Sequence, residues 1–220
     1  MLSFEKHASL QLKQCSSFSF ASHLTSIHLA FGEIIESAKY YPIVFTDSEI
    51  PMLMGIVGVG GNNSFIDHQG KWLVPYVPAI IRTYPFALLP TNTQNQYSVA
   101  IDVDAPHFLE EEGQFLFDAE GKTAPWVDQL IKYLLNMQRE YQVSQAVGTS
   151  LKKAGLIAQR CVEITLKNGK RKGFQGFLCV DETAVNALPE ERKKDMESNG
   201  EMTLLKAHRD SLIHFDKFFE

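Results

Sequence analysis

The chain has 220 residues, of which 45% are hydrophobic and 21% are charged, so it has the composition of a folded globular protein. This composition excludes a disordered, collagen-like or coiled-coil chain. The formal net charge of −5 gives no electrostatic reason for binding phosphate backbones, and we expect no nucleic-acid partner. Its cysteines, Cys15, Cys161 and Cys179, form an odd set without a C-x-x-C motif, which favours buried free thiols over a disulfide framework or a zinc site.

Two features of the sequence bear on where the protein resides. No apolar run approaches the roughly 20 residues that span a bilayer, because the runs at 50–59 and 73–81 are interrupted by Gly or Pro. We therefore expect no transmembrane segment. The first residues, 1–15, lack the apolar core of a secretory signal, which leads us to expect a cytoplasmic protein.

The first part of the chain alternates between strand and helix patterns. Apolar residues with a period of two at 10–12 and 18–20 predict one or two short strands. Between residues 31 and 39 the apolar positions follow i, i+3, i+4 and i+7, which predicts an amphipathic helix. The Tyr41-Pro42 pair ends this helix, because a residue before proline is disfavoured in the helical conformation. Residues 43–45 then predict a buried strand.

The segment 51–64 is an apolar strand that runs into glycines and asparagines. It resembles a phosphate-binding loop only superficially, since no GK[ST] follows and the glycine spacing does not give G-x-G-x-x-G. We expect a turn or bulge between strands, because Gly and Asn tolerate the positive φ that such turns need.

Three later segments, 65–72, 115–122 and 165–170, run from apolar residues into a turn that contains Asp or Asn followed by Gly. Such turns reverse the chain between neighbouring strands. The sheet is therefore predicted to be largely antiparallel. The shared D-x-x-G-K pattern of the first two is a requirement of tight turns rather than a functional repeat.

The second half of the sequence predicts several helices. Apolar periodicity indicates helices at 124–141, 143–154, 183–196 and 211–219, with Pro125 in a first turn, Gly155 as a stop signal and Asp181 as an N-cap. Strands are predicted at 162–166, 174–180 and 202–208. The whole chain, 1–220, is thus predicted to form a single α+β domain with a mainly antiparallel sheet and flanking amphipathic helices.

Polar residues that could carry catalysis are gathered near residue 105, with His68 as a more distant candidate. His68, Asp102, Asp104 and His107, with the acidic run 110–112, could hold iron or zinc, and they support the alternative of a metal-dependent enzyme. No HxD, HExxH or EF-hand spacing is present, which favours an exposed acidic loop. Cys15 and Cys179 have no recognisable base beside them in sequence. We therefore expect no metal and no cofactor.

The sequence resembles the bacterial SapC-like family over residues 7–218. The resemblance is carried by segments 41–45, 63–67, 70–72, 76–86, 116–118, 176–181, 207–208 and 211–212, of which Tyr76-Val-Pro-Ala-Ile-Ile-Arg-Thr-Tyr-Pro-Phe86 is the most specific. It implies a family named after a surface-layer-associated protein, with no established activity and no catalytic residues to transfer. Because the chain lacks an evident export signal, a cytoplasmic accessory protein is expected.

Residues 62–86 combine polar and aromatic side chains in the segment that also carries this resemblance. We expect a non-enzymatic protein that recognises a small ligand or a protein partner there. Arg82, among apolar neighbours, should pair with a carboxylate, stack on an aromatic ring or grip an anion. The candidate binding residues are Asn62, Asn63, Asp67, Trp72, Tyr76 and Arg82. A homo-oligomer that uses the proline-rich segment as its interface is a further possibility.

Overall fold

The structure, a computed structural model, describes residues 1–93, 96–108, 113–160, 162–165 and 171–219. Its helices are α1 (Phe4–His7), α2 (Ile34–Ser37), α3 (Ala79–Arg82), α4 (Pro125–Lys153), α5 (Glu182–Asn186), α6 (Glu190–Ser198) and α7 (Glu201–Ser211). Short 3-10 helices occur at η1 (Ser19–Ala21), η2 (Phe31–Glu33), η3 (Pro106–Phe108) and η4 (Leu212–Phe219). The strands are β1 (Gln11–Leu12), β2 (Ser26–His28), β3 (Ile43–Thr46), β4 (Leu53–Ile56), β5 (Gly58–Val59), β6 (Asn62–Asn63), β7 (Phe86–Pro90), β8 (Tyr97–Ile101), β9 (Gln114–Phe115), β10 (Ile157–Gln159), β11 (Val162–Thr165), β12 (Arg171–Phe174) and β13 (Phe177–Val180).

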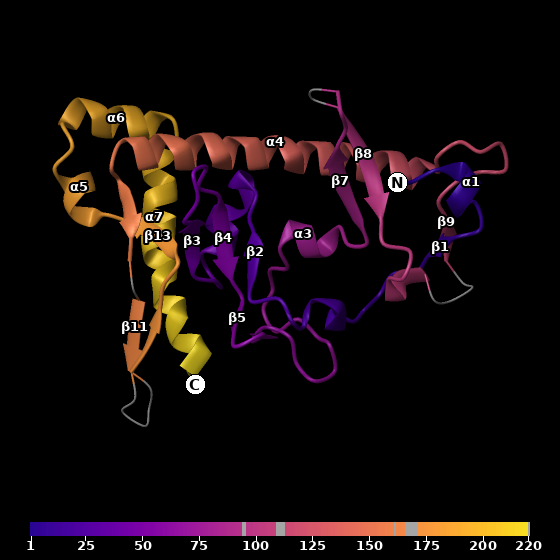
Figure 1. The fold of residues 1–220 in the computed structure, drawn as a ribbon, viewed down its shortest axis with the longest axis horizontal. Helices are drawn as coiled ribbons and strands as arrows, with labels where there is room; N and C mark the ends of the chain where they lie inside the picture. The colour runs from indigo at the N-terminus through magenta and orange to yellow at the C-terminus, as the bar shows by residue number, and fades with distance from the viewer. Residues whose placement is uncertain (94–95, 109–112, 161, 166–170, 220) are drawn as a thin grey trace.

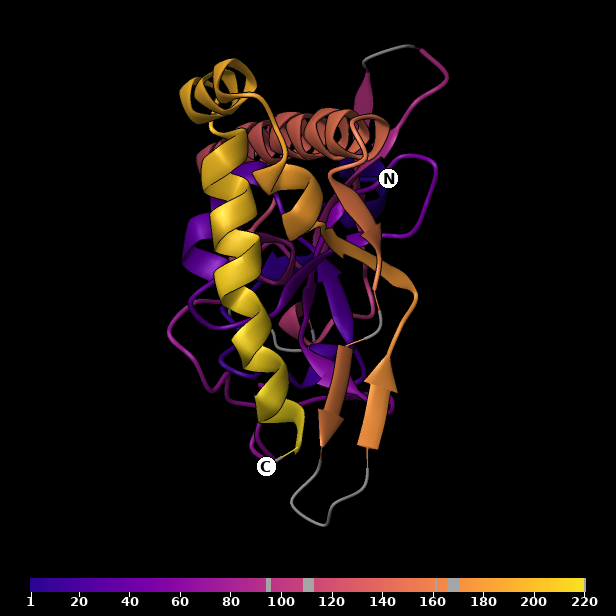
Figure 2. The ribbon, with the colours of Figure 1, turned by 90° about the vertical axis from the view of Figure 1, so that its left-hand side faces the viewer.

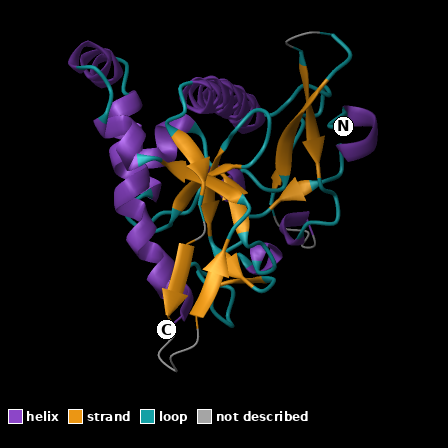
Figure 3. Ribbon diagram, turned by 60° about the vertical axis from the view of Figure 1, so that its left-hand side comes forward, coloured by secondary structure: helices purple, strands orange, loops and turns teal. Residues whose placement is uncertain are grey.

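The central sheet of the described chain has five strands in the order β10-β13-β3-β4-β2, and every pairing in it is antiparallel. Its middle strands are apolar on both faces, and Ile43, Val44 and Phe45 are fully buried. Two-stranded ribbons surround it: β1-β9, β5-β6, β7-β8 and β11-β12. Figure 3 shows β7-β8 near the N-terminus and β11-β12 near the C-terminus. The predicted α+β class with a mainly antiparallel sheet is confirmed.

Helix α4 is a single helix, whereas the sequence analysis predicted two, at 124–141 and 143–154. That division was wrong because no residue between 141 and 143 breaks a helix, and the apolar periodicity continues across Gln142. The helix lies across one end of the central strands and reaches β7 and β8 at its other end (Figure 1). Its predicted ends are confirmed: Pro125 lies in the first turn, and Gly155 has a φ of 68° just beyond the last turn.

The C-terminal segment differs from the prediction in two places. The helix predicted at 183–196 is divided into α5 and α6, because Pro189 excludes Leu188 from the helical conformation. The strand predicted at 202–208 is wrong: these residues belong to α7, where a helical period buries apolar side chains. α7 packs against β13 and β3, and η4 continues it along the sheet (Figure 2). Asp181 caps α5 as predicted, accepting hydrogen bonds from two backbone amides.

Two predictions near the N-terminus also need correction. The helix expected at 31–39 is shorter, consisting of η2 followed by α2, and ends at Ser37. The alternating residues 18–20 form no strand, because Ser19–Ala21 is a 3-10 turn and β1 spans only Gln11–Leu12. The glycine-rich turn is confirmed: Gly60 and Gly61 have φ values of 65° and 86° between β5 and β6.

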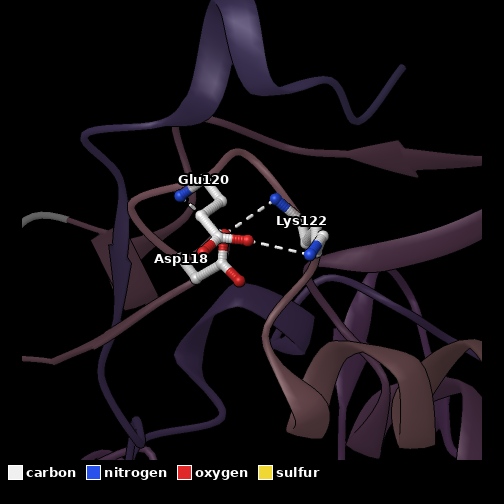
Figure 4. Close-up of polar contacts among 3 residues, drawn as sticks. All are labelled: Asp118, Glu120 and Lys122. Atoms are coloured by element: carbon white, nitrogen blue, oxygen red, sulfur yellow. Dashed lines mark hydrogen bonds and ion pairs between the residues drawn. The ribbon is translucent and has the colours of Figure 1, made fainter.

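The predicted turns at 65–72 and 115–122 are built in the same way. Asp67 Oδ1 accepts hydrogen bonds of 2.9 Å from the amides of Gln69 and Lys71. Asp118 Oδ1 accepts equivalent bonds from Glu120 and Lys122, whose side chains also form an ion pair (Figure 4). The D-x-x-G-K pattern therefore specifies an Asp-centred turn. The third predicted turn, 165–170, lies mostly outside the described residues.

The hydrophobic residues that the structure describes form three clusters, and α4 joins two of them. The larger cluster packs the central sheet against α7 and includes Leu151 of α4. The other one lies beside β7 and includes Val127 and Leu134 from the first half of α4. Because one rigid helix contributes to both, α4 fixes the position of each cluster relative to the other.

Candidate functional site

A cavity of about 610 Å³ lies where these two clusters meet. Phe18, Phe20 and Ile81 on its wall belong to the larger cluster, and Leu12 belongs to the one beside β7. Its lining residues come from three parts of the chain: Leu12, Lys13, Gln14, Cys15, Phe18 and Phe20; Ile81, Arg82 and Tyr84; and His107, Gly113 and Gln114. The volume is within the usual range for small-molecule sites, roughly 300–1,000 Å³.

Backbone hydrogen bonds hold the N-terminal wall of the cavity, residues 12–20, in place. The amide of Phe18 donates to the carbonyl of Gly70 at 2.7 Å, which docks this wall on the Asp67 turn. The amide of Lys13 donates to the carbonyl of His107 at 3.0 Å. Gly70 is required at its position, since a Cβ there would lie 2.0 Å from Ser17 Oγ and the φ is 80°. The Asp67 turn does not line the cavity, but it holds the N-terminal wall of the cavity in position through the hydrogen bond from Phe18 to Gly70.

Three ring systems form an aromatic wall within the cavity. Phe20 stacks on Tyr84 with the ring centroids 4.3 Å apart and the planes inclined by 20°. His107 lies 5.6 Å from Phe20 and 5.4 Å from Tyr84, measured between ring centroids. The hydroxyl of Tyr84 donates a 2.7 Å hydrogen bond to Asp102 Oδ2. Burial and this bond raise the pKa of Tyr84 to about 12, so the ring is neutral at physiological pH.

His107 lines the cavity and has a buried ring nitrogen, Nδ1, without a hydrogen-bond partner among the described residues. Burial lowers the pKa of His107, so the imidazole is neutral near pH 7. A buried N–H without a partner is costly, which favours the tautomer with the proton on Nε2. In that tautomer Nε2 is the hydrogen-bond donor of His107.

Arg82 contributes a positive charge whose position is fixed by aromatic rings. Its guanidinium carbon lies 5.8 Å from the centroid of the Tyr76 ring and 5.9 Å from that of Tyr133 on α4. The predicted stacking on an aromatic ring is confirmed. In the described part of the chain, no carboxylate lies within ion-pair distance of Arg82. Lys13 also lines the cavity, and no Asp or Glu is among the lining residues that the structure describes.

Tyr76 connects Arg82 to the buried carboxylate of Glu33. Its hydroxyl donates to Glu33 Oε1 at 2.6 Å, and the same oxygen accepts the amide of Ala79 at 2.6 Å. Burial raises the pKa of Tyr76, the bond to Glu33 raises it further, and the charge of Arg82 opposes the rise. Tyr76 is therefore a neutral ring that positions Arg82 rather than a wall of the cavity.

Three of the other four predicted binding residues, Asn63, Asp67 and Trp72, are used within the fold. Asn62 is exposed at the β5-β6 turn, whereas Asn63 is buried, with Nδ2 donating to the carbonyl of Ala21 and Oδ1 accepting from the amide of Phe65. Asp67 centres its turn, and Trp72 is buried with its ring 5.6 Å from that of Phe18. Of the six, the structure brings Arg82 and Tyr76 together.

The residues of the metal-enzyme alternative do not converge. His68 is exposed on the Asp67 turn, whereas Asp102 accepts hydrogen bonds from Tyr84 and from the amide of Asp104. His107 alone of these four lines the cavity. Across the described ranges, no three His, Cys, Asp or Glu side chains form a group that could hold a metal ion. The acidic run at 110–112 lies outside those ranges.

Two cysteines have described positions. Cys15 lines the cavity, and its thiol donates to the carbonyl of Ser17 at 3.2 Å. Cys179 is buried in β13, and burial raises the pKa of its thiol to about 11. Both thiols are free, but only Cys179 is buried as predicted, since Cys15 is half-buried; Cys161 lies outside the described residues.

The aromatic wall is not predicted by any pattern in the sequence. Phe20 and Tyr84 are 64 positions apart in the chain, so no local pattern relates them. The sequence gives one indication of this wall: Tyr84 follows Arg82 by two residues. Both lie in the segment 76–86, which is rich in aromatic residues and prolines.

Comparison with known proteins provides the family. The SapC family model matches residues 2–218. The chain belongs to the SapC family. The resemblance predicted from the sequence is confirmed, and the cavity of this SapC-family protein lies wholly within the matched segment. A search of curated proteins and a search of solved structures each gave no match. None of the helices in the described ranges has the length and apolar character needed to cross a membrane.

Proposed function

We propose that this SapC-family chain is a non-enzymatic accessory protein that binds a small ligand in the cavity between the two hydrophobic clusters that α4 joins. The observation that carries the proposal is the composition of the wall: packed rings, a positioned arginine and no described carboxylate. Apolar walls with a few fixed polar groups are typical of small-molecule sites. Concavity favours a small ligand over a protein partner.

Binding is favoured over catalysis because two reactive groups of the wall, the thiol of Cys15 and the hydroxyl of Tyr84, are already engaged. A nucleophile normally has a base within hydrogen-bond reach. The thiol of Cys15 donates to a backbone carbonyl, which is not a general base. The hydroxyl of Tyr84 does contact the Asp102 carboxylate, but burial and this bond raise the pKa of Tyr84 to about 12, so the hydroxyl stays protonated.

The proposal extends to the whole chain as one domain in the cytoplasm. The sharing of α4 between these two hydrophobic clusters supports a single domain. The odd set of cysteines without a disulfide framework supports a reducing compartment. Limited proteolysis tests the first point, since a single domain resists cleavage between the clusters, and cell fractionation tests the second.

A fragment screen by ligand-observed NMR tests ligand binding at this cavity. Gln114 lines the cavity from β9, whereas its neighbour Phe115 is exposed and does not line it. We expect fragments that bind the wild type to lose their signals with Gln114→Trp, which fills the cavity, and to keep them with Phe115→Trp. Fragments that bind both variants equally, or a wild type that binds none, would contradict the proposal.

A further inference from the structure

We infer that the ligand of this cavity is an aromatic oxyanion: a planar ring system that carries a carboxylate or a related acidic group. The inference rests on the proposed function and names its ligand class. It assigns the acidic group to Arg82 and the ring to the aromatic wall of Phe20, Tyr84 and His107.

The charge of the ligand follows from the environment of Arg82. The centroids of two aromatic rings, those of Tyr76 and Tyr133, lie 5.8 and 5.9 Å from the guanidinium carbon, and the described residues supply no carboxylate to the guanidinium. A guanidinium carries five N–H donors along its planar edge, and contacts with two neighbouring rings do not use all of them. A carboxylate fits this edge with two parallel hydrogen bonds.

Glu33 does not take the place of such an anion. Its two carboxylate oxygens accept three hydrogen bonds, from the amide of Ala30, the hydroxyl of Tyr76 and the amide of Ala79. The side chain is buried, whereas Arg82 is exposed. Glu33 therefore acts on Arg82 through Tyr76, by holding the ring on which the guanidinium lies.

The planarity of the ligand follows from the wall. Phe20 and Tyr84 stack with almost parallel planes, and His107 meets both rings at an angle. Flat faces and edges of this kind pack best against another planar ring. The neutral His107 adds a hydrogen-bond donor at Nε2, which suits an oxygen of the ligand. A volume of about 610 Å³ leaves room for a fused ring together with its acidic group.

Three matched probes separate charge from planarity: naphthoate, the neutral naphthylmethanol and the saturated, non-planar decalincarboxylate. Their affinities for the full chain are measured by calorimetric titration. We expect naphthoate to bind about tenfold more tightly than either of the others, as one charge-assisted pair and one aromatic contact would give.

Arg82→Gln should remove the preference for naphthoate over naphthylmethanol and leave the affinity for naphthylmethanol unchanged. Arg82→Lys keeps the charge without the planar donor edge and should retain only part of the preference. The matched control is Arg139→Gln, an exposed arginine on α4 that does not line the cavity. Thermal melts show that each variant is folded, which is expected because Arg82 is exposed.

The outcomes distinguish this inference from the proposed function. Equal affinities for naphthoate and naphthylmethanol, both abolished by Gln114→Trp, would overturn the oxyanion and leave the binding site in place. Equal affinities for naphthoate and decalincarboxylate would overturn the planar ring. Failure of all three probes to bind the wild type would overturn the ligand class, while the fragment screen continues to test the site independently.

Discussion

The indole Nε1 of Trp72 donates a 2.8 Å hydrogen bond to the hydroxyl of Tyr41, and both side chains are buried. Tyr41 in turn donates to the backbone carbonyl of Tyr76. Burial raises the pKa of Tyr41, so the hydroxyl keeps the proton that this second bond needs. This chain of contacts fastens the segment that leads to Arg82 onto the start of the central sheet.

Replacing Tyr41 by Phe should therefore destabilise the protein by about 2 kcal/mol, because it leaves a buried indole N–H and a buried carbonyl without partners. Chemical denaturation measures the change, and the indole N–H resonance of Trp72 should shift. Tyr40→Phe is the matched control, since the hydroxyl of Tyr40 has no hydrogen bond to any residue that the structure describes. Equal effects of the two substitutions would argue against a structural role for the Tyr41 hydroxyl.

Glu33 makes a second connection between the same segments, and its loss should also be costly. Glu33→Gln leaves one acceptor oxygen for three donors, so the amide of Ala30 or the pair from Tyr76 and Ala79 loses its partner. We expect a loss of about 2 kcal/mol in the free energy of unfolding. Glu36→Gln should cost under about 1 kcal/mol, because its ion pair with Lys39 is exposed. A larger effect at Glu36 than at Glu33 would contradict this account.

The sequence predicted local features of the fold better than the way distant segments meet. The Asp67 turn, the Asp181 cap and the stop at Gly155 depend on neighbouring residues only, and all three are confirmed. The division of α4 and the strand expected at 202–208 were wrong. A short run of apolar residues does not determine whether it forms a helix or a strand, or where that element ends, because this depends on the segments that it packs against.

The candidate site shows the same limit. Arg82 was singled out correctly as a residue that needs an aromatic or acidic neighbour, and its stacking is confirmed. Trp72 and Asn63 have the residue types of a binding surface, but the sequence does not reveal that Tyr41 and the backbone of Ala21 already occupy their polar atoms. Phe20 joins the wall through tertiary packing alone.

The stability of the protein should depend on pH through His208, which is fully buried in α7. Its Nε2 accepts the amide of Val180 at 3.1 Å, so the ring must be neutral there. Burial lowers the pKa of His208 from 6.5 to about 4. Between pH 6.5 and pH 4 the unfolded chain therefore binds more protons than the folded chain. The stability that the neutral His208 contributes is complete above pH 6.5 and is lost as the pH falls towards 4.

We expect a loss of about 2 kcal/mol between pH 7 and pH 5 from this group. Denaturation curves at several pH values measure it. Burial also lowers the pKa of His107 and His214, which act in the same direction. His208→Gln isolates the contribution of His208, since the variant should show a smaller pH slope than the wild type; an unchanged slope would refute the assignment.

Gly148 should resist replacement by Ala, although Ala is the better helix former by about 1 kcal/mol. It lies within α4, where a Cβ would come 2.2 Å from the carbonyl oxygen of Pro51 and 3.0 Å from its carbon. Both obstacles are backbone atoms, so the helix or the segment before β4 must move, and we expect a net destabilisation of about 1–3 kcal/mol. The matched control is Gly32→Ala, where the new Cβ would meet only the flexible end of the Glu140 side chain at 3.3 Å. Thermal melts compare the two variants. A stabilised Gly148→Ala protein would mean that α4 does not approach the loop before β4 as closely as the structure has it.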